Sequence, residues 1–488
     1  MPLRGQPVYC FGVIVAAILL SLLLGQGTTA QPAPQLQPLL ERGEEALARG
    51  DLSAAESAFA EARRLEPDNP VVYSYLGELH ARRREYGEAV ADFRKAIRLA
   101  PSEPQPYFRL AVLQARLERF HDARQTLNEL LEARPEYPDT HLLLGRIAGE
   151  QGDHAAAEEH LRRYVRLQPE DPQGLGELGV VLLAREQFQE AEAFLKRVLE
   201  IDPESEPAHH NLGRLYSRRG EHERARKHLE AATRLLPGNA EGFYQLGTVL
   251  MRMGELAEAE TAFRRALALE PENLEARYAL GTLLRRQGRS EEAAEVLAEH
   301  ERLSARALEE RQRQRRISAY HLDARKLLEQ DRLEEAREKL QEILALEPEN
   351  DLAYYRLGQL FFLRREYERA LEAVRSAIRA KDFEPAYHFL EGMCWDRLGE
   401  AEKAARAFER VVELADYADA YRALGRIELG RGNYPQAVAR LRRAVELEPQ
   451  DPDLRLALAE ALEKAGYEEE ARKQMAEAEA LRSGSGPR

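Results

Sequence analysis

The sequence of 488 residues contains only two cysteines and one tryptophan, and aromatic residues make up 7% of it. Cys394 is the single cysteine after the first thirty residues, so an intramolecular disulfide framework is excluded for most of the chain. The sequence has no glycine-rich phosphate loop ending in Lys-Ser or Lys-Thr, and no His-Glu-x-x-His pattern. Two common signatures of nucleotide-binding and zinc enzymes are therefore missing. Because no disulfide framework can form, the fold must be held together by packing.

Charge is abundant, but basic residues are not in excess. Charged residues reach 32% of the sequence and the formal net charge is -14. Such a charge does not favour nucleic acid or anionic lipid as a partner. Acidic and basic residues are interleaved, and Ala, Leu, Glu and Arg dominate. This mixture is typical of long helices with solvated surfaces and not of sheets.

Residues 1–30 differ from the rest of the chain. Arg4 precedes an uncharged apolar run at 8–24, and small residues follow it as far as Ala30. This order resembles a secretory signal peptide and predicts cleavage after Ala30. The apolar run is only slightly shorter than the about 20 residues that cross a bilayer, so an uncleaved anchor is the alternative. The next residues, 31–35, contain two prolines and are interpreted as a Pro-rich tether.

An internal repeat organises the remainder. Prolines end successive units at intervals of 34 positions, and small residues recur with the same spacing inside each unit. These prolines are Pro67, Pro101, Pro135, Pro169, Pro203, Pro237 and Pro271. Asp382 and Asp416 stand near two later positions where the proline is missing. A unit of this length cannot bury its own apolar face, so the repeat predicts a stack of units in a quasi-linear fold.

The unit that begins at Ala240 predicts two antiparallel helices. Phe243, Leu246 and Leu250 are spaced to lie on one face of a first helix. Gly247 of that helix and Ala259 of the second helix are small, which is expected where two helices cross with little room. A larger side chain at such a crossing costs about 1–3 kcal/mol through overpacking.

The order of a large residue, Leu-Gly, Gly, Ala, Phe or Leu, Ala and Pro resembles the tetratricopeptide repeat family. Small second-helix residues from Ala55 to Ala471 carry the resemblance through residues 36–485. The resemblance implies an all-α helical-repeat solenoid, a right-handed superhelix of about 13 helix-turn-helix units whose first helices line a concave groove. It also implies protein binding without a cofactor, and not catalysis.

Nine additional residues at 308–316 interrupt the repeat. No Gly or Pro occurs between Gly288 and Pro348, so one long helix is expected to run through the insert. The predicted organisation is a first block of eight repeats at 36–307, a helical insert at 308–316, a second block of five repeats at 317–485 and a flexible tail at 486–488. A shift of the repeat by one residue is also expected around 391–399.

Two local patterns that suggest other roles are discounted. Gly174, Gly176 and Gly179 spell the dinucleotide fingerprint GxGxxG, but a turn between helices precedes them where the fingerprint requires a strand. Trp395, beside Cys394, is interpreted as core filling at the junction of two units. No segment remains to form a catalytic domain, so no enzyme is predicted.

The fifth residue of each unit is expected on the first helix, on the face turned away from the second helix. In the later units this position and the position one turn further on are rich in His, Tyr and Arg. Tyr and Arg are enriched at interface hot spots, although these side chains can also pack between adjacent first helices. The predicted groove residues are His210, Arg214, Tyr244, Tyr278, His321, Arg325, Tyr355, Gln359, His388, Arg422 and Arg426.

The predicted function is a scaffold that binds extended, acidic segments of other proteins in this groove. Histidines with an ordinary pKa near 6.5 would tighten such binding between about pH 7.5 and 6. The alternative is a membrane-anchored assembly or regulatory subunit of an envelope complex. We expect the protein to be exported, either periplasmic or secreted, or else anchored by one N-terminal transmembrane segment. No nucleic acid partner is expected.

Overall fold

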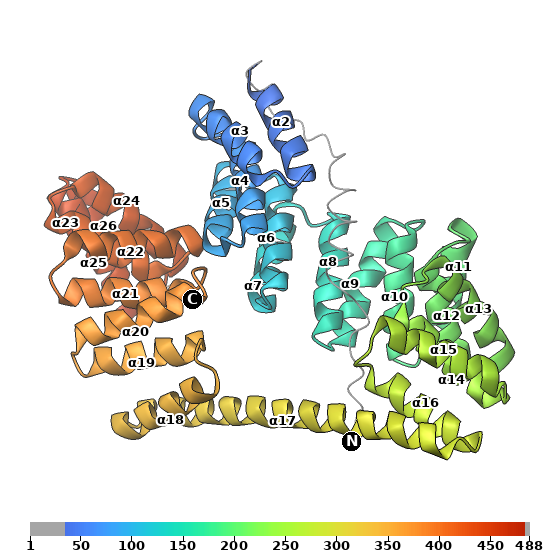
Figure 1. Ribbon diagram of the computed structural model, residues 1–488. Coiled ribbons are helices and arrows are strands. Elements are labelled where there is room, and N and C mark those ends of the chain that lie inside the picture. The colour runs from blue at the N-terminus through green and yellow to red at the C-terminus, as the bar shows by residue number, and fades with distance from the viewer. Residues whose placement is uncertain (1–34, 484–488) are drawn as a thin grey trace. The chain divides into compact units, whose positions relative to one another are not determined.

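The computed structural model describes residues 35–483, so the segments interpreted as signal peptide and tail lie outside the described residues, as does most of the tether. Within that part of the chain there are 25 helices and no strand (Figure 1). The prediction of an all-α helical-repeat solenoid is therefore confirmed. The helices are α2 (Leu36–Ala48), α3 (Leu52–Leu65), α4 (Pro70–Arg83), α5 (Tyr86–Leu99), α6 (Pro104–Arg116), α7 (Phe120–Ala133), α8 (Pro138–Glu150), α9 (His154–Leu167), α10 (Pro172–Ala184), α11 (Phe188–Ile201), α12 (Glu206–Arg218), α13 (His222–Leu235), α14 (Ala240–Met253), α15 (Leu256–Leu269), α16 (Leu274–Arg286), α17 (Ser290–Glu329), α18 (Leu333–Leu346), α19 (Asp351–Leu363), α20 (Tyr367–Ala380), α21 (Pro385–Arg397), α22 (Ala401–Leu414), α23 (Ala418–Gly430), α24 (Tyr434–Leu447), α25 (Pro452–Lys464) and α26 (Glu468–Arg482).

Short turns join the two helices of each pair, and every such turn contains one residue with positive φ. Eight of these residues are glycines and five are not. Gly254, between α14 and α15, has a φ of 88°, a value that glycine adopts without steric penalty. Arg84, between α4 and α5, has a φ of 64°, which costs about 1–2 kcal/mol for a residue with a Cβ atom.

The two helices of a pair cross at small residues, as the sequence predicts. A Cβ atom added to Gly247 of α14 would lie 2.7 Å from the ring of Phe263 on α15. Ala259 and Phe263 are both fully buried. The close crossing therefore requires Gly247, because any side chain there would collide with the aromatic ring that fills the interface.

The core consists of local clusters that follow one another along the chain. In the residues between 142 and 293 one cluster includes Leu161, Leu195, Leu229 and Phe263, each from a different helix pair. The residues between 317 and 394 form a separate cluster. Each pair buries its apolar face mainly against its neighbours, which is the arrangement expected of stacked repeats.

The insert at 308–316 lies inside α17, a single helix of 40 residues (Figure 1). The described residues divide into two compact units, one comprising Glu118–Gln314 and the other comprising 35–117 together with 315–483. The second unit therefore combines helices from both blocks of repeats recognised in the sequence. Among residues 35–483 no helix has the length and apolar character needed to cross a bilayer.

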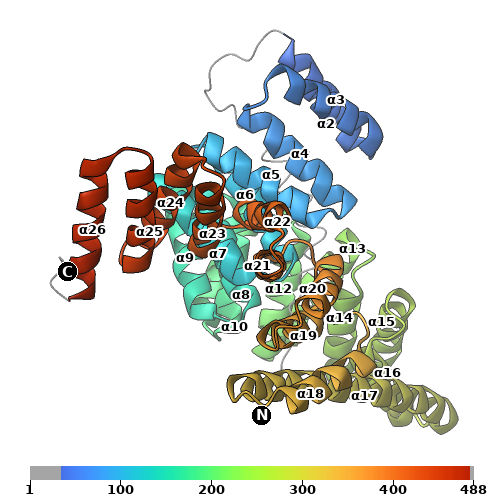
Figure 2. The ribbon, with the colours of Figure 1, turned by 90° about the vertical axis from the view of Figure 1, so that its left-hand side faces the viewer.

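Within the second unit, α5 packs on α22, and both views of the ribbon show these helices side by side (Figures 1 and 2). Phe93 of α5 shares an apolar cluster with Leu414 of α22 and with Phe383, which lies in the link before α21. The ring of Tyr86 meets the ring of Phe383 edge-on, with 6.0 Å between their centroids. Phe383 and Leu414 are both buried. We call this contact the α5–α22 clasp.

Two aspartates that depart from the repeat consensus make polar contacts in the clasp. Asp382 accepts a hydrogen bond of 3.1 Å from the backbone N–H of Gly87. Asp416 forms an ion pair with Arg94 at 3.1 Å. In most other repeats a proline ends this segment, and a proline side chain offers neither the carboxylate nor its charge.

The expected shift of the repeat at 391–399 is wrong. Helix α21 has 13 residues, as α19 does, and Gly392 packs on Phe408 as Gly247 packs on Phe263. The irregularity lies later, because the link between α22 and α23 consists of residues 415–417 and is one residue shorter than the link at 381–384. The fifth residue of α21 is consequently Phe389, and His388 precedes it.

Candidate protein-binding surfaces

A hollow of about 450 Å³ opens on the first helices near the C-terminal end of the second unit. Its apolar wall comes mainly from α19, α21 and α23. Arginines from α21 and α23 also line it. We call it the aromatic hollow, and its main residues are Phe362, Phe389, Met393, Arg397, Arg422 and Arg426.

Aromatic contacts fix the apolar part of the hollow. The ring of Phe389 meets the ring of Tyr417 edge-on at 4.9 Å between centroids. Phe389 also packs on Phe408, with 5.5 Å between centroids. Because its neighbours hold the ring in place, Phe389 offers apolar area to a ligand without losing many rotamers on binding.

The three arginines of the hollow differ in their partners. Arg422 pairs with Asp419 at 2.5 Å, and Arg426 pairs with Asp396 at 2.6 Å. The guanidinium of Arg397 lies 6.0 Å from the ring centroid of Phe362. No carboxylate in residues 35–483 comes within ion-pair distance of Arg397. This arginine is therefore available to an anionic group from outside.

The predicted groove residues are exposed to very different degrees. Some belong to the first unit and the others to the second. In the structure Tyr278, Arg325, Arg422 and Arg426 are exposed, Arg214, Tyr244, His321, Tyr355 and Gln359 are half-buried, and His210 and His388 are buried. Of these residues, Arg422 and Arg426 line the aromatic hollow.

His210 lies in the core and not on an accessible surface. It is 4% exposed, and neither ring nitrogen has a hydrogen-bond partner among the described residues. Burial, reinforced by the nearby charge of Arg214, lowers the pKa of His210 to about 4. The imidazole is therefore neutral at physiological pH.

The two other histidines of the predicted groove are also engaged. In His321 one ring nitrogen lies 3.1 Å from the side chain of Asn350 and the other 2.9 Å from Arg356. His388 contacts the backbone oxygen of Asp382 at 2.8 Å. Burial lowers the pKa of both histidines. The expected gain of charge near pH 6.5 is wrong for these residues and for His210, because burial disfavours their charged forms.

The tyrosines of the predicted groove partly pack against side chains of their own or the next repeat. Tyr355 lies 4.8 Å from Tyr387 between ring centroids, and its hydroxyl accepts a hydrogen bond of 3.0 Å from Gln359. Tyr244 lies 6.2 Å from Phe263. Tyr278 remains 55% exposed. Packing and surface exposure thus coexist in this set of residues.

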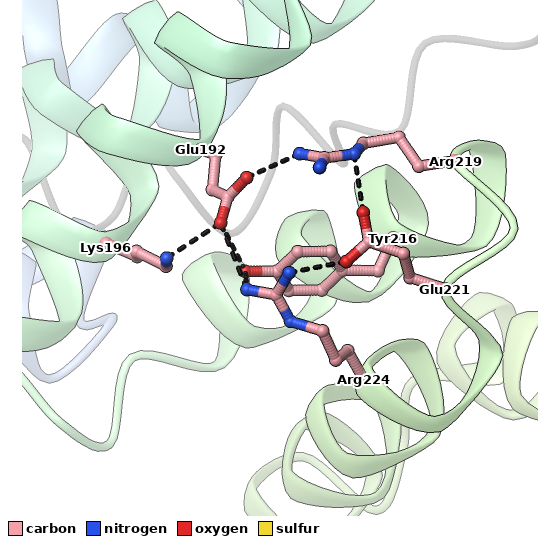
Figure 3. A network of polar contacts seen from close by, with 6 residues as sticks. All are labelled: Glu192, Lys196, Tyr216, Arg219, Glu221 and Arg224. Atoms are coloured by element: carbon pink, nitrogen blue, oxygen red, sulfur yellow. Dashed lines mark hydrogen bonds and ion pairs between the residues drawn. The ribbon is translucent and has the colours of Figure 1, made fainter.

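A network of charges lies between α11, α12 and α13 in the first unit (Figure 3). The carboxylate of Glu192 accepts a hydrogen bond of 2.9 Å from the Tyr216 hydroxyl and pairs with Arg219 at 2.6 Å. It also pairs with Lys196 at 2.7 Å and with Arg224 at 3.1 Å. Glu192 thus bonds to three cations that surround one tyrosine, and Glu221 pairs with two of them, Arg219 and Arg224.

A second hollow, of about 370 Å³, lies on α20, α21 and α22 in the second unit. The cationic side chain of Lys403 lies 4.5 Å from the ring centroid of Trp395, and that of Arg375 lies 5.1 Å from it. Arg406 and Arg410 complete the wall. We call these five residues the cationic pocket.

Sequence reasoning missed part of both surfaces. The misplaced shift of the repeat assigned the fifth position of α21 to His388, so Phe389 was not predicted. Phe362 lies outside the fifth-residue series. Trp395 does pack against the cores on both sides of it, as expected of a junction, but it also lines the cationic pocket. The available signal was that Arg375 lies on the helix before the single tryptophan, and that Lys403, Arg406 and Arg410 lie on the helix after it.

The described residues show no ligand-binding role for the GxGxxG pattern and no candidate metal site. Gly174, Gly176 and Gly179 all lie within α10, so no strand leads into the GxGxxG pattern. Gly174 contacts Tyr164, and Gly179 contacts Leu195. No group of three or more metal-ligating side chains comes together in residues 35–483.

Stacked helix pairs with a hollow on their first helices define a helical-repeat protein. Sequence models described as tetratricopeptide repeat match residues 40–104, 108–172, 142–206, 182–246, 244–307, 322–385 and 367–420, and a model described as TPR repeat matches 425–466. The chain therefore belongs to the tetratricopeptide repeat family. No curated protein shows significant similarity to the sequence.

Several solved structures are similar to parts of the chain. A tetratricopeptide repeat protein from Parabacteroides merdae is 20% identical, with 52% of this chain and 100% of the other covered and a TM-score of 0.41. MamA from Desulfovibrio magneticus is 23% identical, with 34% and 95% covered and a TM-score of 0.32. YrrB, described as a TPR protein with an unusual peptide-binding site, is 22% identical, with 38% and 96% covered and a TM-score of 0.33.

Proposed function

We propose that the protein is a non-enzymatic scaffold that binds extended segments of partner proteins on its first helices. The aromatic hollow carries this proposal, because a rigid apolar surface lies beside an arginine that has no carboxylate partner. Interfaces concentrate their binding energy in such aromatic and arginine side chains. The role is consistent with membership of the tetratricopeptide repeat family.

The chemistry of the hollow defines the segment that it fits. A large apolar side chain would cover Phe362, Phe389 and Met393, which line the hollow together. A neighbouring carboxylate would reach Arg397, which can donate two parallel hydrogen bonds to it. The proposed ligand is therefore an extended segment with an apolar anchor next to an acidic residue.

The test begins with selection of displayed random peptides on the immobilised full chain. We expect enrichment of peptides that carry a large apolar residue beside Asp or Glu. The affinity of a selected peptide should fall about tenfold or more in Arg397→Gln, because a charge-assisted hydrogen bond is lost. Arg472→Gln removes the same charge from an exposed site on α26 and serves as the matched control. Equal affinity of both variants would contradict the proposal.

We also propose that the protein is exported. The support is the sequence of residues 1–30, in which a basic residue, an apolar run and small residues follow one another. N-terminal sequencing of the protein from its native host is the test. A mature chain beginning at Gln31 supports export with cleavage. A chain beginning at Met1 in the membrane fraction would favour the alternative, an anchored assembly or regulatory subunit.

A further inference from the structure

The cationic pocket concentrates positive charge on an acidic protein. The pocket walls carry Arg375, Lys403, Arg406 and Arg410, and Glu391 is the carboxylate among the lining residues. The whole chain has a net charge of -14. Cations in such an acidic protein are usually paired with nearby carboxylates. The carboxylates around this pocket therefore show whether its cations are free to bind a ligand.

The network of Figure 3 supplies an internal comparison, because it occupies the equivalent place in another part of the solenoid. Tyr216 and Trp395 occupy the same position in α12 and α21, counted from the first residue of each helix. The flanking cations correspond in the same way. The equivalent residues are Lys196 and Arg375, Tyr216 and Trp395, and Arg224 and Lys403.

The two places differ in the residue at the centre of the cations. Glu192 of α11 is bonded to the surrounding cations in the first unit. The equivalent residue of α20 is Leu371, which is 5% exposed and packs in the apolar core. An aliphatic side chain accepts no hydrogen bond, so the cations of the second unit lack the central carboxylate that those of the first unit share.

Carboxylates at the edge of the cationic pocket form ion pairs with only some of its cationic side chains. Arg375 pairs with Glu391 at 3.1 Å, and Lys403 pairs with Glu400 at 3.2 Å. Arg406 is exposed and contacts a backbone oxygen at 3.4 Å. No carboxylate in the described part of the chain forms an ion pair with Arg406. An incoming anion would therefore find at least one guanidinium ready to donate.

A carboxylate from a distant helix already reaches the edge of the pocket. Glu88 of α5 pairs with Arg410 at 3.0 Å, and Arg410 also pairs with Glu413 at 3.0 Å. Glu88 is presented by a helix surface and not by a neighbouring loop. The pocket edge thus accommodates an acidic side chain carried on a polypeptide that approaches from outside its own repeat.

We propose that the cationic pocket is a second binding site, one that takes the carboxylates of an acidic segment of a partner protein. Arg406 and Lys403 receive the carboxylates, while the Trp395 ring covers the aliphatic part of the segment. The site lies on α20, α21 and α22, apart from the aromatic hollow, and does not depend on the function proposed for that hollow. The acidic remainder of the surface confines such a ligand to the pocket and makes binding sensitive to salt.

Fluorescence anisotropy of the full chain with a fluorescein-labelled peptide of alternating Glu and Ala tests the proposal. The Glu peptide should bind at low salt, and its counterpart with Gln in place of Glu should not. The double variant Lys403→Gln/Arg406→Gln should weaken binding about tenfold or more, because two charge-assisted contacts are lost. The matched control is Arg224→Gln/Lys227→Gln, which removes the same number of charges from the equivalent positions of α13. This control should alter the affinity by less than about twofold, since Glu192 and Glu221 already occupy the cations of that site.

Two further variants act on the pocket from within. Leu371→Glu introduces the carboxylate that the first unit has at this position, and it should weaken binding of the Glu peptide. Glu88→Gln releases Arg410 and should strengthen binding. Circular dichroism of each variant checks that the helices remain folded. Absence of Glu peptide binding, or equal losses in the two double variants, would overturn the proposal. An oligothymidylate of the same charge that binds as tightly, with the same dependence on Lys403 and Arg406, would overturn the assignment to a protein segment.

Discussion

The backbone N–H of Gly87 donates a hydrogen bond of 3.1 Å to the carboxylate of Asp382, which lies 295 positions further along the chain. A Cβ atom at residue 87 would lie 2.6 Å from the guanidinium of Arg410 and 2.7 Å from that carboxylate. Glycine is a poor helix former, and in the interior of a helix it costs about 1 kcal/mol relative to alanine. Its presence near the start of α5 is explained by the close approach of α22.

Replacement of this glycine tests the α5–α22 clasp. Gly87→Val should displace Asp382 and Arg410, because a branched side chain does not fit the space between the two helices. Hydrogen exchange should accelerate in α5 and in residues 382–416. Ala257→Val is the matched control, since Ala257 has the same position in α15 and is exposed. Unchanged exchange of residues 382–416 in Gly87→Val would contradict the clasp.

The crossing of α14 and α15 is sensitive to volume at Ala259. Ala259→Leu should destabilise the protein by about 1–3 kcal/mol, because the residue is fully buried beside Phe263. The loss should be concentrated in neighbouring helix pairs, since coupling in stacked repeats is mostly between neighbours. Urea unfolding combined with hydrogen exchange measures both effects. Ala257→Leu, on the exposed side of the same helix, should change stability by less than about 0.5 kcal/mol.

The network around Glu192 makes stability depend on one carboxylate. Burial alone would raise the pKa of Glu192, but hydrogen bonds from Lys196, Tyr216 and Arg224 outweigh it and lower the pKa to about 2. Glu192→Gln should cost about 1–3 kcal/mol at neutral pH, because a charged acceptor is lost.

The difference between the wild type and Glu192→Gln depends on pH in a defined direction. A lowered carboxyl pKa contributes stability that is present above the unfolded value near 4.5 and is lost as the pH falls through about 2. Urea titrations at pH 7 and pH 3 measure this change. A constant difference at both values would show that Glu192 acts through its shape and not through its charge.

Buried His210 should make the protein less stable in mild acid. Its pKa falls from 6.5 to about 4 on folding, so its contribution is present above pH 6.5 and is lost as the pH falls toward 4. The loss from this group amounts to about 3 kcal/mol. His210→Leu keeps a side chain of similar size and should remove this part of the pH dependence. Urea unfolding between pH 7.5 and 4 is the measurement, and identical pH profiles of variant and wild type would refute the assignment.

Local rules made most of the fold predictable from the sequence. The 34-residue interval, the small residues represented by Gly247 and Ala259, and the prolines all act within one helix pair or between neighbours. Helix periodicity and close packing leave few alternatives for such a unit. The helical character of 308–316 followed from the same reasoning, because no residue there interrupts a helix.

The candidate surfaces were less predictable, because exposure depends on how neighbouring helices cover each side chain. His210 and Tyr278 share the fifth position of their units, yet one is 4% and the other 55% exposed. The position of a residue on a helix is set by its own repeat. Its burial is set by the side chains of the next repeat, and these vary from unit to unit.

The sequence by itself determined the repeat, the helix pairs and the small residues at their crossings, since these depend on interactions between residues close in the chain. It also marked Asp382 and Asp416 as departures from the repeat, but it gave no reason for them. Only the tertiary structure brought Asp382 to Gly87 and Asp416 to Arg94. Contacts between helices so distant in sequence leave no periodic signal, because each is made once and depends on the summed geometry of many repeats.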